Sequence, residues 1–157
     1  MRKIGLGVGT VGVLVAGAFA FTLLGGGPKS PEPGVCGHIE RADEGHGARY
    51  RAIDCAAEHA NVRVAKVVDD ASQCPTGGSP YTTFTRSATL CLIPNFVEGV
   101  CYAGDKMVGM RKVACTSAEA VRVTSAAKGR AECANGHKVT YPEPAVTFCL
   151  VRVAEMR

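Results

Sequence analysis

The sequence contains no tryptophan and few other aromatic residues, only four tyrosines and five phenylalanines. It also lacks a C-x-x-C pair and a G-x-S-x-G string. These absences exclude a thioredoxin-like dithiol motif and the nucleophile elbow of α/β-hydrolases. No basic run with interleaved aromatic residues occurs, and after position 30 the chain carries 15 basic and 14 acidic residues. We therefore predict no nucleic-acid partner.

One motif-like string does occur near the N-terminus, where Gly7, Gly9 and Gly12 form G-x-G-x-x-G. A dinucleotide-binding loop needs a strand before the glycines, a helix after them and then a second parallel strand. Here the apolar run is followed by GGGPKSPEPG, which contains three prolines and no apolar run. Because no second strand completes the unit, we expect no nucleotide cofactor.

The same glycines lie in a stretch without charge that runs from residue 4 to residue 24. A helix of this length is about 31 Å long at ~1.5 Å per residue, which matches the ~30 Å hydrocarbon core of a bilayer. Arg2 and Lys3 precede it, so the positive-inside rule predicts a cytoplasmic segment 1–3 and an extracellular C-terminal part. Residues 25–34 form a Pro/Gly linker. Small-x-small sites near Ala18 leave a cleaved signal peptide, and hence a secreted protein, as the alternative.

Small residues recur at helical spacing within this predicted single-pass anchor. Such a face allows two membrane helices to pack closely and dimerise. The plainer interpretation, which we favour, is that membrane helices are generally rich in glycine and alanine. The candidate packing face consists of Gly5, Gly9, Gly12, Ala16 and Ala20.

All eight cysteines follow the predicted anchor. An even number of cysteines in a small exported domain indicates a disulfide framework. Zinc sites usually contain closely spaced pairs, whereas the nearest cysteines here, Cys91 and Cys101, are ten positions apart. We therefore expect disulfides and no metal. The predicted disulfide residues are Cys36, Cys55, Cys74, Cys91, Cys101, Cys115, Cys133 and Cys149.

Cysteine spacing and the surrounding sequence both indicate an internal repeat. The gaps are 19, 19 and 17 residues from Cys36, and 14, 18 and 16 residues from Cys101. Each half opens with Gly-Val-Cys, continues through Val-Arg-Val and closes near Cys-Leu. We predict a tandem duplication, with repeat 1 over 35–98 and repeat 2 over 99–157. Several pairings remain open within each repeat, and we favour the sequential one, Cys36–Cys55, Cys74–Cys91, Cys101–Cys115 and Cys133–Cys149.

Both repeats have the pattern of β-strands. Around Val62–Val64 and Val121–Val123, apolar and polar residues alternate with period two, as in half-buried strands. The stretches TLCLI and TFCLVRV are short and apolar, as buried strands are. Single helical turns are predicted only at 56–60 and 117–120. The predicted fold is mainly β, with two tandem disulfide-stapled β-rich repeats after one N-terminal transmembrane helix.

The strings GVC, AIDC, NVRV, YTTFTR, TLCLIPN and EGVCY occur in this order. This arrangement resembles the LppU-type family of exported actinobacterial proteins, many of which are lipoproteins or single-pass membrane proteins. The resemblance covers roughly residues 34–153. It implies a location in the cell envelope and supplies no catalytic residues. A lipid anchor does not carry over, because no cysteine precedes Cys36.

No constellation in the sequence predicts catalysis. A solvated loop is expected at Asp69-Asp70 and a surface side chain at His59, while 81–85 is expected to form a half-buried strand. We therefore predict a non-enzymatic, membrane-anchored extracytoplasmic module of the cell envelope that binds an envelope protein, a glycan or a lipid, or serves structurally. The alternative is an envelope enzyme with a site between the repeats. No cofactor is predicted, and a homodimer through the membrane helix has no further support.

Overall fold

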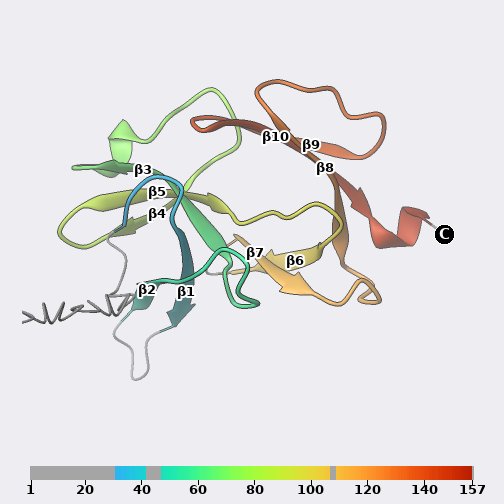
Figure 1. Ribbon diagram of the computed structural model, residues 1–157, viewed down its shortest axis with the longest axis horizontal. Helices are drawn as coiled ribbons and strands as arrows, with labels where there is room; N and C mark the ends of the chain where they lie inside the picture. Colours follow the sequence, from blue (N-terminus) through green and yellow to red (C-terminus); the bar gives the residue numbers. More distant parts are fainter. Residues whose placement is uncertain (1–30, 42–46, 107–108, 157) are drawn as a thin grey trace, which may run out of the picture.

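The computed structural model describes residues 31–41, 47–106 and 109–156, which form two antiparallel β-sheets (Figure 1). The predicted anchor at 4–24, its packing face from Gly5 to Ala20 and most of the linker lie outside the described residues. No helix within the described ranges has the length and apolar character needed to cross a membrane. The mainly β prediction is confirmed for the described part.

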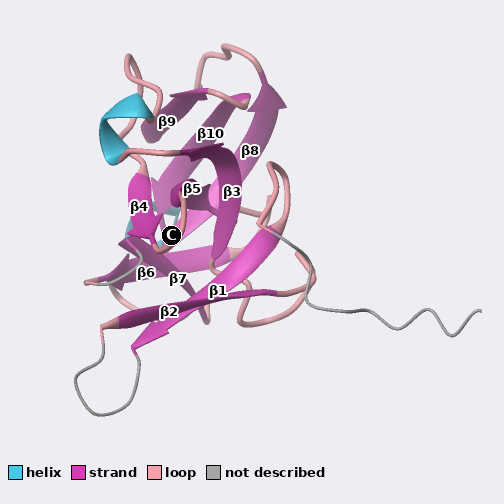
Figure 2. Cartoon of the chain, turned by 90° about the vertical axis from the view of Figure 1, so that its left-hand side faces the viewer, coloured by secondary structure: helices cyan, strands magenta, loops and turns pink. Residues whose placement is uncertain are grey.

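The first sheet contains five strands in the order β2-β1-β3-β5-β4. All of its neighbouring strands are antiparallel. A short 3-10 helix, η2 (Ala71–Gln73), follows the third strand and lies at the edge of the molecule in Figure 2. The strands are β1 (Cys36–Arg41), β2 (Ala48–Ala52), β3 (Val62–Val68), β4 (Thr82–Thr85) and β5 (Thr89–Pro94).

The second sheet also contains five antiparallel strands, in the order β7-β6-β8-β10-β9. The two orders are equivalent, because β7, β6, β8, β10 and β9 take the places that β2, β1, β3, β5 and β4 take in the first sheet. The chain ends with the 3-10 helix η3 (Val153–Met156). The strands are β6 (Cys101–Asp105), β7 (Gly109–Val113), β8 (Val121–Lys128), β9 (His137–Pro142) and β10 (Ala145–Arg152).

Local details also correspond between the sheets. The backbone N–H of Gly34 donates to the carbonyl of Val64 at 2.8 Å, and that of Gly99 donates to the carbonyl of Val123 at 2.8 Å. Both glycines have positive φ, 90° and 84°, a conformation that glycine adopts without steric cost. Each third strand carries an irregularity in its register just after this valine. The chain therefore enters both sheets in the same way.

The central strands are buried because neighbouring elements cover them, and this burial is stabilising because the strands are largely apolar. Five consecutive residues of β5, from Thr89 to Ile93, are buried, and Thr147 to Leu150 of β10 are buried as well. By contrast, β4 alternates between half-buried and exposed residues, as expected for an edge strand with one solvated face. The predicted helical turns at 56–60 and 117–120 are wrong. Both stretches form hydrogen-bonded turns instead.

Two hydrophobic clusters form the core. The smaller one belongs to the first sheet alone, whereas the larger one joins residues of both sheets around the ring of Phe96. This ring packs edge-on against Tyr102 and Phe148, with centroid distances of 4.8 and 5.2 Å. Such aromatic pairs contribute about 0.5–1.5 kcal/mol each beyond the area that they bury. The connection between β5 and β6 thus ties the two sheets together.

Candidate functional site

All eight cysteines form disulfides, and the four pairs are those of the sequential pattern. The Cα–Cα distances lie between 4.9 and 5.6 Å, within the usual range for bridged cysteines. Cys91 and Cys149, which lie on buried strands, are therefore both committed to bridges. No free thiol is left for chemistry.

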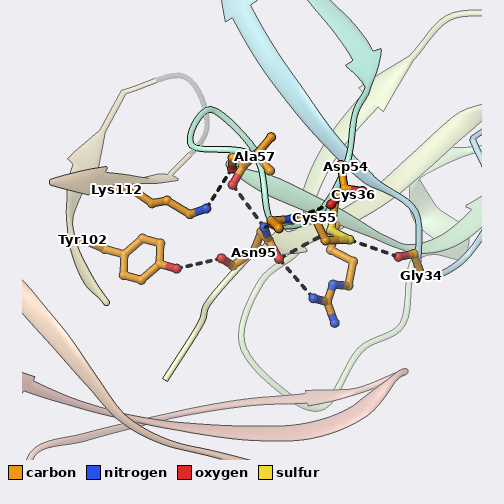
Figure 3. The surroundings of a disulfide bond; sticks show 11 residues. Gly34, Cys36, Asp54, Cys55, Ala57, Asn95, Tyr102 and Lys112 are labelled. Atoms are coloured by element: carbon orange, nitrogen blue, oxygen red, sulfur yellow. Dashed lines mark hydrogen bonds between the residues drawn. A yellow bond between two sulfur atoms is a disulfide. The ribbon is translucent and has the colours of Figure 1, made fainter. Parts of the chain in front are cut away.

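The disulfide Cys36–Cys55 lies beside a buried amide, that of Asn95 (Figure 3). Its Nδ2 donates to the backbone carbonyls of Cys55, at 2.9 Å, and Ala60, at 3.2 Å. Its Oδ1 accepts from a guanidinium nitrogen of Arg63 at 3.1 Å. Since Asn95 is 1% exposed, these bonds replace water that the amide has lost. The group holds the turn after Cys55 against the end of β5.

The same residue receives a contact from the second sheet. The hydroxyl of Tyr102 donates to the backbone carbonyl of Asn95 at 2.8 Å and accepts from the backbone N–H of Val97 at 2.9 Å. Nearby, the ammonium group of Lys112 donates to the carbonyl of Ala57 at 3.0 Å (Figure 3). Burial of Lys112 lowers its pKa, and the charge of Glu58 opposes that change. This region is a structural junction between the two sheets.

A second set of contacts joins the sheets near β9. The ammonium group of Lys66 lies 3.1 Å from a carboxylate oxygen of Glu143. The hydroxyl of Tyr81 donates to the backbone carbonyl of Glu143 at 2.6 Å and accepts from its backbone N–H at 3.2 Å. The backbone N–H of Ser79 donates to the carbonyl of Thr140 at 2.7 Å. These bonds hold the segment before β4 against the edge of the second sheet.

Between the two sheets lies a groove of about 390 Å³. Its walls come from the segment before β4, the end of β5, the start of β7, and β9 and β10. Most of its surface is apolar, and none of the lining residues within the described ranges is charged or a histidine. A pocket of this size and composition is typical of a site for a small apolar ligand. The groove is lined in part by Tyr81, Pro94, Phe96, Met110, Val139 and Tyr141.

Tyr141 is the most informative residue of this groove. It is 5% exposed, and its ring packs edge-on against Tyr81 at 5.2 Å. Burial, with a smaller effect from Tyr81, raises the pKa of Tyr141 to about 12. Its hydroxyl forms no hydrogen bond with the described residues, among which the fully buried side-chain atoms without a partner are the hydroxyl of Tyr50 and Nε of Arg63. The groove is therefore lined by a tyrosine whose hydroxyl is protonated at neutral pH and can donate a hydrogen bond.

Asp70 and His59, which the sequence analysis also named, form contacts with nearby residues outside the groove. Asp70 caps η2, where its carboxylate accepts from the backbone N–H of Ser72 at 2.8 Å. Hydrogen bonds with the side chain of Ser72 and with its backbone N–H lower the pKa of Asp70. The carbonyl of His59 is 2.8 Å from Nδ1 of His38, whose Nε2 lies 3.4 Å from a Glu40 carboxylate oxygen. These side chains lie on the first sheet, and none of them lines the groove.

No group of three or more His, Cys, Asp or Glu side chains within the described ranges is placed to hold a metal ion. The groove could not be predicted from the sequence, because five separate segments of the chain form its walls. The only available signal was Tyr81, the first residue of the strand predicted at 81–85. Comparisons of the chain with protein family models, curated proteins and solved structures found no match.

Proposed function

We propose that this chain is a non-enzymatic binding or structural module of the cell envelope, anchored by residues 4–24 and exposed on the outer side of the membrane. The observation that carries the proposal is the use of all eight cysteines in four disulfides. Such bridges persist in oxidising compartments and are rare in the cytosol. The apolar stretch at 4–24 is the segment of the sequence suited to export and anchoring.

The proposal includes a tandem duplication as the origin of the two sheets. It is supported by the identical strand order and by the matched glycine-to-valine hydrogen bonds at Gly34 and Gly99. Two disulfides within each sheet also support it, since each bridge closes a chain segment of its own half. The LppU-type resemblance belongs to the same proposal and rests on the sequence strings alone.

The linker of residues 25–34 sets the distance from the membrane. Ten fully extended residues reach at most ~33–36 Å, and the linker ends at Gly34, at the entry to the first sheet. The double-sheet domain would therefore stay within about one domain diameter of the lipid surface. A short tether of this kind suits a protein that acts on a partner at or in the membrane.

The first test is mass spectrometry of the full chain from its native membrane fraction. The second is protease treatment of cells whose cell wall has been removed but whose cell membrane is intact. We expect an intact N-terminus, four disulfides in a non-reduced digest, and cleavage of the domain from outside. As a control, the same cells are treated after lysis, which exposes both sides of the membrane.

Other outcomes would contradict parts of the proposal. A mature chain beginning near Phe19 or Phe21 would make the protein secreted rather than anchored. Reduced cysteines in a soluble cytoplasmic fraction would contradict the location altogether. Turnover of an envelope substrate, lost on changing a single side chain between the sheets, would favour the enzyme alternative instead.

A further inference from the structure

The groove between the sheets has the chemistry of a site for a hydrocarbon chain. Its walls combine the rings of Tyr81 and Phe96 with the flexible side chain of Met110 and the aliphatic side chains of Val139 and Leu150. Methionine adapts its shape to irregular apolar surfaces. At about 390 Å³, the space lies within the ~300–1,000 Å³ range of small-molecule sites. A flat protein partner would not need such a recess.

The polar groups of the groove further restrict the chemical class of the ligand. The hydroxyl of Tyr81 already bonds to Glu143, and that of Ser79 accepts from the backbone N–H of Thr140. The other two hydroxyl residues of the lining, Thr82 and Tyr141, form no side-chain hydrogen bond with the described residues. Because the pKa of Tyr141 is about 12, this hydroxyl is protonated at neutral pH and can donate to an acceptor oxygen. A sugar would need several polar partners, whereas most of the surface of the described lining is apolar and none of its described residues is charged.

We propose that this groove binds an acyl chain and that the Tyr141 hydroxyl donates a hydrogen bond to the carbonyl oxygen at the head of that chain. The proposal deepens the proposed function and rests on it for the source of the ligand, because the short linker holds the groove near a lipid surface. An acyl chain with a carbonyl oxygen at its head occurs both in a free fatty acid and in a membrane lipid. The experiment has one arm for each of these two sources.

The test uses the full chain in lipid nanodiscs and two photoactivatable probes. In one arm, palmitic acid carrying a diazirine is added to nanodiscs of ordinary phosphatidylcholine. In the other arm, the diazirine is on an acyl chain of the phosphatidylcholine itself. After irradiation and digestion, we expect labelled peptides containing Tyr81, Met110 or Tyr141. The arm that gives them identifies the source of the chain.

Three variants distinguish the groove from the rest of the surface. Val139→Trp fills the groove and should abolish this labelling. Lys138→Trp is the matched control, because Lys138 is adjacent on β9, is exposed and does not line the groove, so labelling should persist. Tyr141→Phe keeps the ring and removes the donor, which should weaken competition by unlabelled palmitic acid about 2- to 12-fold.

The outcomes separate the two proposals. Labels confined to residues 1–30 in both arms, with the chain correctly inserted, would overturn the acyl site and leave the proposed location intact. Equal groove labelling of Val139→Trp and the unaltered chain, each with four disulfides, would also overturn it. Groove labelling by palmitic acid of a chain that proves not to be anchored would support the site and contradict the location. Unchanged competition in Tyr141→Phe would overturn the hydrogen bond to the carbonyl.

Discussion

Replacing Asn95 should cost more stability than any other single polar substitution at the junction of the two sheets. In Asn95→Ala, the carbonyls of Cys55 and Ala60 lose their donor, and Arg63 loses its acceptor. A neutral hydrogen bond contributes about 0.5–1.5 kcal/mol and a bond to a charged group about 1.5–3 kcal/mol. The expected loss is therefore about 2.5–6 kcal/mol, a large part of the ~5–15 kcal/mol that stabilises a typical domain.

Urea denaturation of the oxidised protein, followed by tyrosine fluorescence or circular dichroism, measures this loss. The change removes volume as well as hydrogen bonds, so Asn95→Leu is the necessary comparison. Leucine has a similar size but leaves the same carbonyls unpaired, and it should lose about as much stability as alanine. A leucine variant within about 1 kcal/mol of the unaltered protein, less than the smallest expected loss, would refute the argument that hydrogen bonding at Asn95 holds this junction.

Three further predictions concern other parts of the molecule. Gly136→Ala should destabilise the protein more than Gly129→Ala in the same denaturation assay, because both positions have positive φ but only at Gly136 would a Cβ collide with the backbone of β10; equal losses would contradict this. Replacing Cys133 and Cys149 together by alanine should lower stability by about 3 kcal/mol, as expected for a bridge closing a loop of 16 residues, and an unchanged Tm would contradict it. Ultraviolet titration should find one tyrosine that ionises only near pH 12 and that disappears in Tyr141→Phe.

The last prediction also gives a pH dependence of stability. Burial raises the folded-state pKa of Tyr141 to about 12, from the value of 10.0 that is usual for a free tyrosine. The unfolded chain therefore releases this proton first, so the contribution of Tyr141 is complete below pH ~10 and is lost as the pH rises toward 12. Tyr141→Phe should flatten this part of the stability curve. An equal alkaline decline in both proteins would assign it to other groups.

Several features of the fold followed from the sequence because they depend on neighbours along the chain. Period-two alternation located strands around Val62 and Val121, since side chains of a strand point to alternate faces. The similar spacing in the two halves favoured the sequential disulfides, and each of the four bridges joins a cysteine on a strand to one in a turn or loop. The turns at 56–60 and 117–120 were mistaken for helical turns, since short stretches with local hydrogen bonds resemble each other in composition.

The candidate site depended on tertiary structure. The groove combines Phe96 from one connection with Met110 and Tyr141 from the other sheet, and no local pattern relates these positions. Asn95 has no distinctive sequence context, yet packing places its amide between Cys55, Ala60 and Arg63. Such contacts arise from how two sheets meet, and many sequences with the same strand pattern would bring together different residues.

The sequence by itself thus determined the strand-rich character of the chain, the disulfide chemistry and the near-neutral surface charge, because each follows from residue type, period and spacing. Only the tertiary structure decided that the two sheets share the larger hydrophobic cluster and leave an apolar groove between them. The physical reason is that burial and unpaired donors are properties of surfaces in contact. The hydroxyl of Tyr141 gained its raised pKa and its place in the groove only when β9 packed against the segment before β4.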